Sequence, residues 1–416
     1  MNARQAPSPG ARGEGEGEGQ RRLPLEGIRI LELGHTVMGP SCSLVLAELG
    51  ADVIKVEPPE GDRTRANVGF GSALFPVFNR NKRSFCIDLK SEAGKAVFHK
   101  VAGTADALIE NFAPGTMKRL GLDYETLSKK HPRLIYCELK GFLSGPYEDR
   151  AALDEIVQFM GGLAYMTGPT GRPLRAGASV VDIMGGLFGA LGIMAALRER
   201  ETTGRGQRVE SSLFESTAFL MAQHMGQQVL TGKAPPPMPE KASSWAVYDP
   251  FVTKDGKTVF IGLTSDNHWR AFCKEFGVHD LLADPELQTN PQRAQRRAKI
   301  MPVVEEKFGN ETFDALVEKL ERLKIPFGPL ARPGDLFEDP HLNQGGRMID
   351  VLLPTGARAK LPGMPLDMDG RKPRIRMQPP RKGEHTRDVL AEVGFGADEI
   401  ERLVREQTVV ADGEAP

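Results

Sequence analysis

The chain has 416 residues, of which 40% are hydrophobic and 26% are charged, and its formal net charge is −1. This length can bury a sizeable core and suggests two or three domains. The balanced charge gives no support for broad electrostatic binding to nucleic acid or to a membrane surface. The 4 cysteines are scattered without a CxxC pair, which predicts a reduced, intracellular protein without a cysteine metal site.

The first 22 residues contain the alternating glycines and glutamates of Gly13–Gly19 and are predicted to form a disordered tail, because they cannot bury apolar area. They lack the apolar core of a signal peptide, and their glutamates argue against an organelle transit peptide. No run approaches the roughly 18 uninterrupted apolar residues of a membrane span. We therefore expect a cytoplasmic location and no membrane partner.

From Leu23 onward, apolar strands alternate with amphipathic helices. The predicted strands are Ile28–Leu33, Ala51–Glu57, Ser84–Leu89, Ala107–Phe112 and Leu134–Lys140, and the first predicted helix is Ser41–Leu49. This alternation is typical of an α/β protein with a Rossmann-like, doubly wound parallel sheet. Ligands bind such sheets beyond the carboxyl ends of the strands. Because no GxGxxG follows the first strand, a nicotinamide or flavin cofactor is disfavoured.

The proline-rich stretch Ala234–Pro239 marks a change in composition and predicts a linker. A smaller α/β segment follows it, with strands near Tyr248–Thr253 and Thr258–Leu263, helices around His268–Phe276 and Pro302–Arg322, and a last helix at Asp398–Arg405. We predict a tail over 1–22, a large Rossmann-like domain over 23–230, a linker over 231–240, a small domain over 241–330, and a return segment over 331–416 that completes the large domain.

Asp182 stands where the small-residue segment Gly177–Val181 passes into a helix rich in glycine and alanine. Aspartate is a good N-cap, and on pattern alone this structural role is the more common one. The sharper hypothesis is that Asp182 is a nucleophile that becomes acylated. No GxSxG or HExxH occurs in the chain, so neither a serine hydrolase nor a zinc site is supported, and no metal is expected.

Several basic residues lie in predicted turns or just past strand ends. Gathered around one crevice, they would suit a ligand with several phosphates, because arginine pairs with phosphate oxygens. They are Arg65, Arg80, Lys82, Arg83, Lys90, Arg119 and Lys140.

The order and spacing of six motifs resemble the class III CoA-transferases, which include formyl-CoA, carnitine and succinyl-CoA-dependent dicarboxylate CoA-transferases. The motifs are Leu23–Leu33, Leu49–Glu57, Asn79–Ser84, Glu110–Gly115, Thr203–Gln207 and Gly383–Thr386. The resemblance runs from about Leu23 to Val404. It implies a large CoA-binding Rossmann-like domain and a small domain in an interlocked homodimer. It also implies an acyl-CoA donor and a carboxylic acid acceptor, with coenzyme A entering as part of a substrate and no tightly bound cofactor.

The family's catalytic aspartate corresponds to Asp182. Its CoA contacts correspond to Val37, Met38, Asp88, Leu89, Lys90, Asn111, Phe112, Ala113, Arg119, Leu120, Lys140, Gly141 and Phe142. Most of these positions follow the predicted strands. Two departures stand out. The segment Glu240–Tyr248 replaces the glycine-only loop of formyl-CoA transferase, which disfavours formate or oxalate as acceptor, and Pro58 and Pro59 stand where some members carry a CoA-binding arginine.

Two alternatives remain open. The same superfamily includes α-methylacyl-CoA racemase, which uses a histidine as a second base, but the corresponding segment Tyr147–Glu155 has no histidine. A catalytically idle CoA-binding paralogue is the other alternative, against which the intact Asp182 argues. We expect succinyl-CoA as donor and a small dicarboxylic or hydroxy acid as acceptor. Candidates for binding the acceptor carboxylate are Arg175, Ser243, Ser244 and Tyr248.

Overall fold

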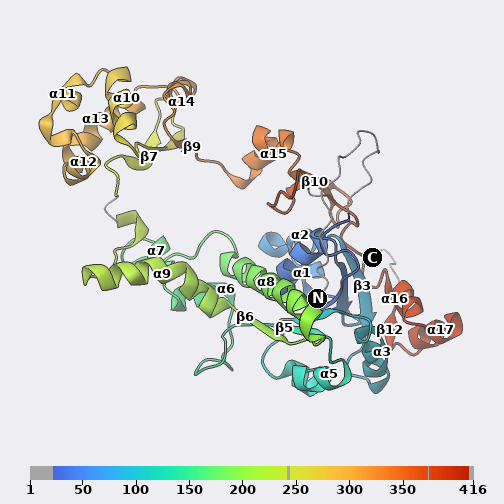
Figure 1. Cartoon of the computed structure of the whole chain (residues 1–416). Helices are drawn as coiled ribbons and strands as arrows, with labels where there is room; N and C mark the ends of the chain where they lie inside the picture. Colours follow the sequence, from blue (N-terminus) through green and yellow to red (C-terminus); the bar gives the residue numbers. More distant parts are fainter. Residues whose placement is uncertain (1–21, 241–243, 373, 412–416) are drawn as a thin grey trace, which may run out of the picture.

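The computed structural model describes residues 22–240, 244–372 and 374–411, and a seven-stranded sheet lies at its centre (Figure 1). The strands are β1 (Arg29–Leu33), β2 (Asp52–Glu57), β3 (Lys82–Ile87), β4 (Ala107–Glu110), β5 (Ile135–Lys140), β6 (Arg208–Ser212) and β12 (Val409–Val410). Their order is β12-β3-β2-β1-β4-β5-β6, and all neighbours are parallel except β12, which runs antiparallel to β3. The predicted α/β class with a doubly wound parallel sheet is confirmed. The predicted disorder of residues 1–21 lies outside the described residues.

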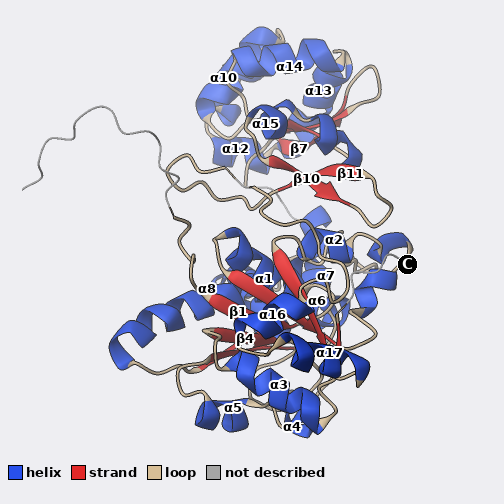
Figure 2. Ribbon diagram, turned by 90° about the vertical axis from the view of Figure 1, so that its right-hand side faces the viewer, coloured by secondary structure: helices blue, strands red, loops and turns tan. Residues whose placement is uncertain are grey.

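Helices cover both faces of this sheet (Figure 2). One face packs against α3 (Glu92–Ala102), α5 (Tyr124–Lys130), α16 (Thr386–Glu392) and α17 (Ala397–Arg405), and the other against α1 (Met38–Glu48) and α8 (Val180–Thr203). The central strands are therefore buried on both sides, and even the charged residues Glu32, Lys55 and Glu57 of β1 and β2 are buried.

The long helix α8 lies directly on α1. A Cβ atom added to Gly186 would come within 2.3 Å of Ser41 Oγ and 2.7 Å of the Met38 carbonyl oxygen, so only glycine allows this approach. By length and composition α8 is the one helix of the described chain that is apolar enough to cross a membrane. One face of α8 packs against α1, β5 and β6, and 39% of its apolar window is buried in the structure.

A smaller body forms around a three-stranded sheet of β7 (Tyr248–Val252), β8 (Thr258–Gly262) and β9 (Phe327–Pro329). Its main helices are α10 (Asp266–Glu275), α13 (Arg297–Gly309) and α14 (Phe313–Arg322), with the shorter α11 (His279–Ala283) and α12 (Asn290–Gln295). The sequence predicted one helix over Pro302–Arg322, but two helices form there. The hydrophobic core of this body draws only on residues 246–327, and both views show it standing apart from the large sheet (Figures 1 and 2).

The remaining helices and strands lie in connections within the large body or between the two bodies. They are α2 (Leu74–Phe78), α4 (Thr116–Leu120), α6 (Asp154–Met160), α7 (Leu163–Thr167), α9 (Leu213–Thr231), α15 (Pro340–Gln344) and the hairpin β10 (Met348–Leu352) and β11 (Arg358–Pro362). After this hairpin the chain returns to the large sheet through α16, α17 and β12. The division into domains at the residue boundaries given above stays a prediction.

Candidate active site

The carboxyl ends of β1 and β4 form the point where the strand order of the sheet reverses, which is where ligands bind in open α/β sheets. The loops that leave these two strands are joined by a pair of hydrogen bonds. The His35 amide donates to Asn111 Oδ1 at 2.8 Å, and Asn111 Nδ2 donates to the His35 carbonyl oxygen at 3.1 Å. The His35 ring also lies 5.8 Å from that of Phe112. Two predicted CoA-binding segments, one after each strand, therefore meet at this point.

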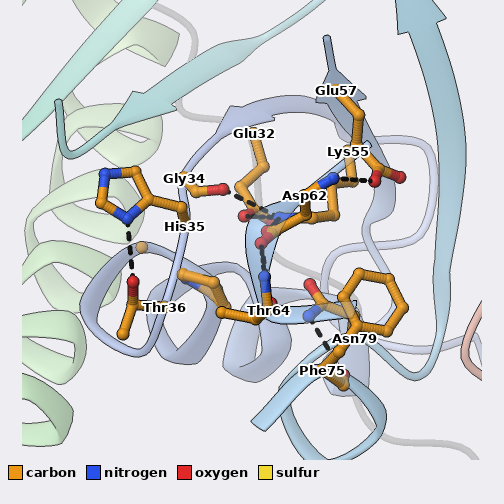
Figure 3. Close-up of polar contacts among 12 residues, drawn as sticks. Glu32, Gly34, His35, Thr36, Lys55, Glu57, Asp62, Thr64, Phe75 and Asn79 are labelled. Atoms are coloured by element: carbon orange, nitrogen blue, oxygen red, sulfur yellow. Dashed lines mark hydrogen bonds and ion pairs between the residues drawn. The ribbon is translucent and has the colours of Figure 1, made fainter. Parts of the chain in front are cut away.

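A buried ion cluster holds both ends of the segment from Gly34 to Pro40, and Figure 3 shows the Lys55 contacts at the Gly34 end. Lys55 Nζ donates to the Gly34 carbonyl oxygen at 2.8 Å, and Lys82 Nζ donates to that of Pro40 at 3.0 Å. Both ammonium groups also pair with Glu32, at 3.0 and 2.8 Å. Because Glu32 and the two lysines are fully buried, this network fixes the path of the loop.

The loop has a strained backbone and leads into an uncapped helix. Thr36 has φ 66°, a left-handed conformation that is rare for a β-branched residue and persists only where its surroundings impose it. The next two residues, Val37 and Met38, are buried, so they present backbone rather than side chains to a ligand. Helix α1 begins at Met38 without a side-chain cap, and the amide groups at such a helix start favour negative charge.

Asp182 is the third residue of α8, and Ser179 occupies the N-cap position. The prediction that Asp182 is the N-cap is therefore wrong. The reason lies on α6, where Asp154 Oδ2 accepts hydrogen bonds from the backbone amides of Val181 and Asp182 at 3.0 and 3.1 Å. Because Asp154 satisfies these amides from outside the helix, the Asp182 carboxylate is not needed as a cap.

The surroundings of Asp182 make its carboxylate unusually basic. Burial, reinforced by the carboxylates of Asp154 and Glu155, raises the pKa of Asp182 to about 7. Charge on this group is thus disfavoured, and forming a neutral ester, anhydride or thioester removes it. A perturbed carboxyl of this kind in a ligand-binding crevice is a candidate nucleophile.

The second turn of α8 contacts Met38, at the strand switch point. A Cβ atom added to Gly185 would lie 2.4 Å from Met38 Cε, so the two helix starts touch. Ser211 Oγ donates to the Gly185 carbonyl oxygen at 2.8 Å and fixes this turn to β6. Asp182 is therefore held one turn away from the segment predicted to bind CoA.

Four of the basic residues predicted to surround the crevice instead form structural ion pairs. Arg65 pairs with Glu57, Arg80 with Glu48, Lys82 with Glu32, and Arg83 with both Asp52 and Glu392. These ion pairs give the four residues a structural role, which was the alternative left open for basic residues in turns and at strand ends. Lys140 is also paired, with Glu148 and Glu210 at 3.1 Å each.

The other predicted CoA contacts lie at the same carboxyl edge of the sheet. Asp88, Leu89 and Lys90 follow β3, Arg119 and Leu120 end α4, and Lys140, Gly141 and Phe142 end or follow β5. Phe112 and Ala113 line a cavity of about 160 Å³, together with Glu110, Tyr136 and Arg208. Burial raises the pKa of Glu110 to about 8. The CoA-binding roles stay predictions, and Phe142, which is buried against Phe214, can offer only its backbone.

The contribution of α6 was missed by sequence reasoning. Asp154 and Gln158 lie one turn apart on this helix, and Gln158 Nε2 donates to Asp154 Oδ1. Gln158 Oε1 accepts from the Ala176 amide at 2.8 Å, which fixes the segment that enters α8. The available signal was the acidic pair at 154–155, which is typical of a helix start.

Comparison with known proteins places this geometry in a family. The model of "CoA-transferase family III" matches residues 25–386. The chain is 33% identical over 389 residues to the succinyl-CoA:glutarate CoA-transferase of Mus musculus, covering 92% of this chain and 89% of that protein. It is 31% identical over 394 residues to the succinyl-CoA–D-citramalate CoA-transferase of Chloroflexus aurantiacus, covering 93% and 98%.

Solved structures agree. A CAIB/BAIF family protein from Brucella suis superposes with a TM-score of 0.79 at 32% identity, over 90% of this chain and 100% of that one. A Mycobacterium tuberculosis protein superposes with a TM-score of 0.77 at 27% identity, over 88% and 99%. The family resemblance inferred from the motifs is thereby confirmed, and the chain belongs to CoA-transferase family III.

Proposed function

We propose that this CoA-transferase moves CoA from succinyl-CoA to a small dicarboxylic or hydroxy acid through covalent intermediates on Asp182. The observation that carries the proposal is Asp182 itself, a partly buried carboxyl with a pKa raised to about 7 by burial and two neighbouring carboxylates, at the start of α8 beside the strand switch point. The names of relatives that use succinyl-CoA support the donor.

In the first half of the proposed reaction, an Asp182 oxygen attacks the thioester carbonyl carbon of the donor. The carbon–sulfur bond breaks, CoA leaves as its thiolate, and a mixed anhydride remains. The thiolate then attacks the Asp182 carbonyl carbon, so that the donor acid leaves as a carboxylate and Asp182 becomes a CoA thioester. Covalent catalysis of this kind replaces one difficult transfer by easier steps.

The second half reverses these events with the acceptor. Its carboxylate attacks the Asp182 thioester and releases CoA thiolate, which then attacks the acceptor carbonyl of the new anhydride and frees Asp182. Each tetrahedral intermediate carries an oxyanion. The amides at the uncapped start of α1 are suited to stabilise it, since preorganised donors of this kind lower such barriers by several kcal/mol.

The proposed chemistry needs only Asp182 and the thiol of CoA, and we assign no step to a metal or a tightly bound cofactor. We keep the cytoplasmic location as a prediction. The test of the function is mass spectrometry of CoA products after incubation with succinyl-CoA and a panel of organic acids. Asp182→Ala should abolish transfer while CoA still binds; substantial turnover by this variant would contradict the mechanism.

We also propose that the chain functions as an interlocked homodimer. The small body shares no hydrophobic core with the large one among the described residues. Apolar side chains stand exposed on α6, α8 and α9, among them Phe159 at 55%, Leu191 at 57% and Phe219 at 65%. Exposed apolar side chains on three helices that pack together support an interface at this place. Sedimentation analysis at micromolar concentration should show a dimer, and a monomer would contradict the proposal.

A further inference from the structure

The segment that leads into α8 is fixed along α6 at two points. The Ala176 amide is held by Gln158, and the Val181 and Asp182 amides are held by Asp154. Helix α6 thus determines where both Arg175 and Asp182 lie. The Glu155 carboxylate connects the two residues, because it pairs with Arg175 and also acts electrostatically on Asp182.

The Arg175 guanidinium uses only part of its hydrogen-bonding capacity. Its Nη1 pairs with Glu155, and its Nε donates to the Ala176 carbonyl oxygen at 3.0 Å. Its Nη2 donates no hydrogen bond to any residue that the structure describes. The Arg175 and Glu155 side chains are 30% and 47% exposed. An ion pair exposed to this degree contributes only about 0–1 kcal/mol to stability. Stability alone therefore does not account for this arginine.

An aromatic ring from a distant part of the chain completes the arrangement. Phe70 belongs to the connection between β2 and β3, and its ring centre lies 5.7 Å from the Arg175 guanidinium carbon. Phe70 is 78% exposed, and nearby Val68 is 85% exposed. A planar cation against an exposed aromatic ring is a surface suited to an organic anion, whose carboxylate pairs with arginine while its methylene groups contact the ring.

We propose that Arg175 binds the second, non-reacting carboxylate of a dicarboxylic acid acceptor, while the first carboxylate reacts at Asp182 and Phe70 contacts the methylene groups between them. This inference rests on the proposed function and adds to it a residue that determines specificity. The second carboxylate takes the free Nη2 and competes with Glu155 for Nη1. A monocarboxylic acid of equal length has no group to make this contact.

The experiment compares Arg175→Ala with the wild type, using glutarate and pentanoate as acceptors of equal chain length. In the proposed mechanism the donor acid leaves before the acceptor reacts, so kcat/KM for the acceptor does not depend on how the donor binds. Loss of a charged hydrogen-bonded contact should lower kcat/KM for glutarate by about 10–100-fold. The value for pentanoate should change by less than about twofold.

Arg172→Ala is the matched control, because Arg172 is exposed on the same segment and its substitution by alanine removes the same charge. It should leave the ratio of the two kcat/KM values unchanged. An equal loss for both acids in Arg175→Ala would show a structural role and overturn the inference, as would no loss for either.

A separate readout distinguishes failure of this inference from failure of the proposed function. Incubation with acetyl-CoA alone should load Arg175→Ala and the wild type with CoA at Asp182 to the same extent. A wild type that loads Asp182 but uses pentanoate as well as glutarate overturns the inference and the preference for a dicarboxylic acid, and leaves CoA transfer through Asp182 standing. A wild type that cannot be loaded from any acyl-CoA overturns both.

Discussion

The raised pKa of Asp182 predicts that its carboxylate destabilises the fold. The pKa is about 7 in the folded chain against 3.8 for an ordinary aspartate, so the folded state binds the proton more tightly than the unfolded state does. Stability should therefore fall as pH rises from about 4 to about 7 and remain lowered above that. The gap of about three pH units corresponds to about 4 kcal/mol above pH 7. Asp182→Asn has nearly the same shape but no charge and should escape this loss.

The assay is thermal unfolding of Asp182→Asn and the wild type at pH 5 and pH 8. The free energy of unfolding of the variant relative to the wild type should increase by about 3 kcal/mol from pH 5 to pH 8, because most of the ionisation of Asp182 in the folded state lies between these values. For a chain of 416 residues this corresponds to a shift of about 3–4 °C in Tm. Other titrating groups, including Glu110, act on both proteins and cancel in the difference.

Glu201→Gln removes an exposed carboxylate near the other end of α8 and serves as the control. Its difference from the wild type should be the same at both pH values. If the difference for Asp182→Asn were also independent of pH, the raised pKa and its assigned cause would be refuted. The same variant should be inactive in CoA transfer, so the gain in stability would accompany a loss of function.

Three further predictions concern the neighbours of Asp182 and the buried cluster. Glu155→Gln removes one of the carboxylates that raise the pKa of Asp182. The pH midpoint of kcat/KM should therefore lie below that of the wild type, which we expect near 7. A midpoint that does not move in the pH–rate profile would contradict this. Asp154→Ala should lower kcat by about 10–100-fold and the free energy of unfolding by about 0.5–2 kcal/mol, because the amides at the start of α8 lose their acceptor. Asp154→Asn keeps an acceptor oxygen and should retain more activity. Equal kcat values for the two variants would argue against the positioning role. Lys82→Met should lower the free energy of unfolding, measured in urea, by about 3–5 kcal/mol, because fully buried Glu32 loses one of its two lysine partners. A loss below about 1 kcal/mol would show that the cluster does not hold the loop.

The alternation of strands and helices was sufficient to predict the parallel sheet, because buried apolar residues such as Ile30, Leu31, Val53 and Ile54 mark the central strands in the sequence. Strand β12 escaped prediction. It is only two residues long and gains its place by antiparallel pairing with β3, more than three hundred residues away in the chain. Local patterns carry no signal for a pairing of that kind.

In the candidate site too, local patterns predicted some features, whereas others depend on residues distant in the chain. The motif order identified the family, and that resemblance singled out Asp182, whose catalytic role stays a proposal, near the start of a glycine-rich helix. Its cap was misassigned, because the acceptor for the helix amides comes from Asp154 on another helix. Likewise, Lys82 carries the same charge in the sequence whether it faces a phosphate or a buried carboxylate. Only the fold, which places Glu32 2.8 Å from its Nζ atom, decides between them.

Trapping the covalent intermediate tests the central claim most directly. The wild type is incubated with succinyl-CoA, and the protein is treated with borohydride or hydroxylamine and digested for peptide mass spectrometry. Transfer through an Asp182 thioester predicts that the peptide containing Asp182 is reduced to the alcohol or converted to the hydroxamate, only when succinyl-CoA is present. An unmodified Asp182 peptide, from protein that transfers CoA to an acceptor acid in a parallel assay, would contradict the account.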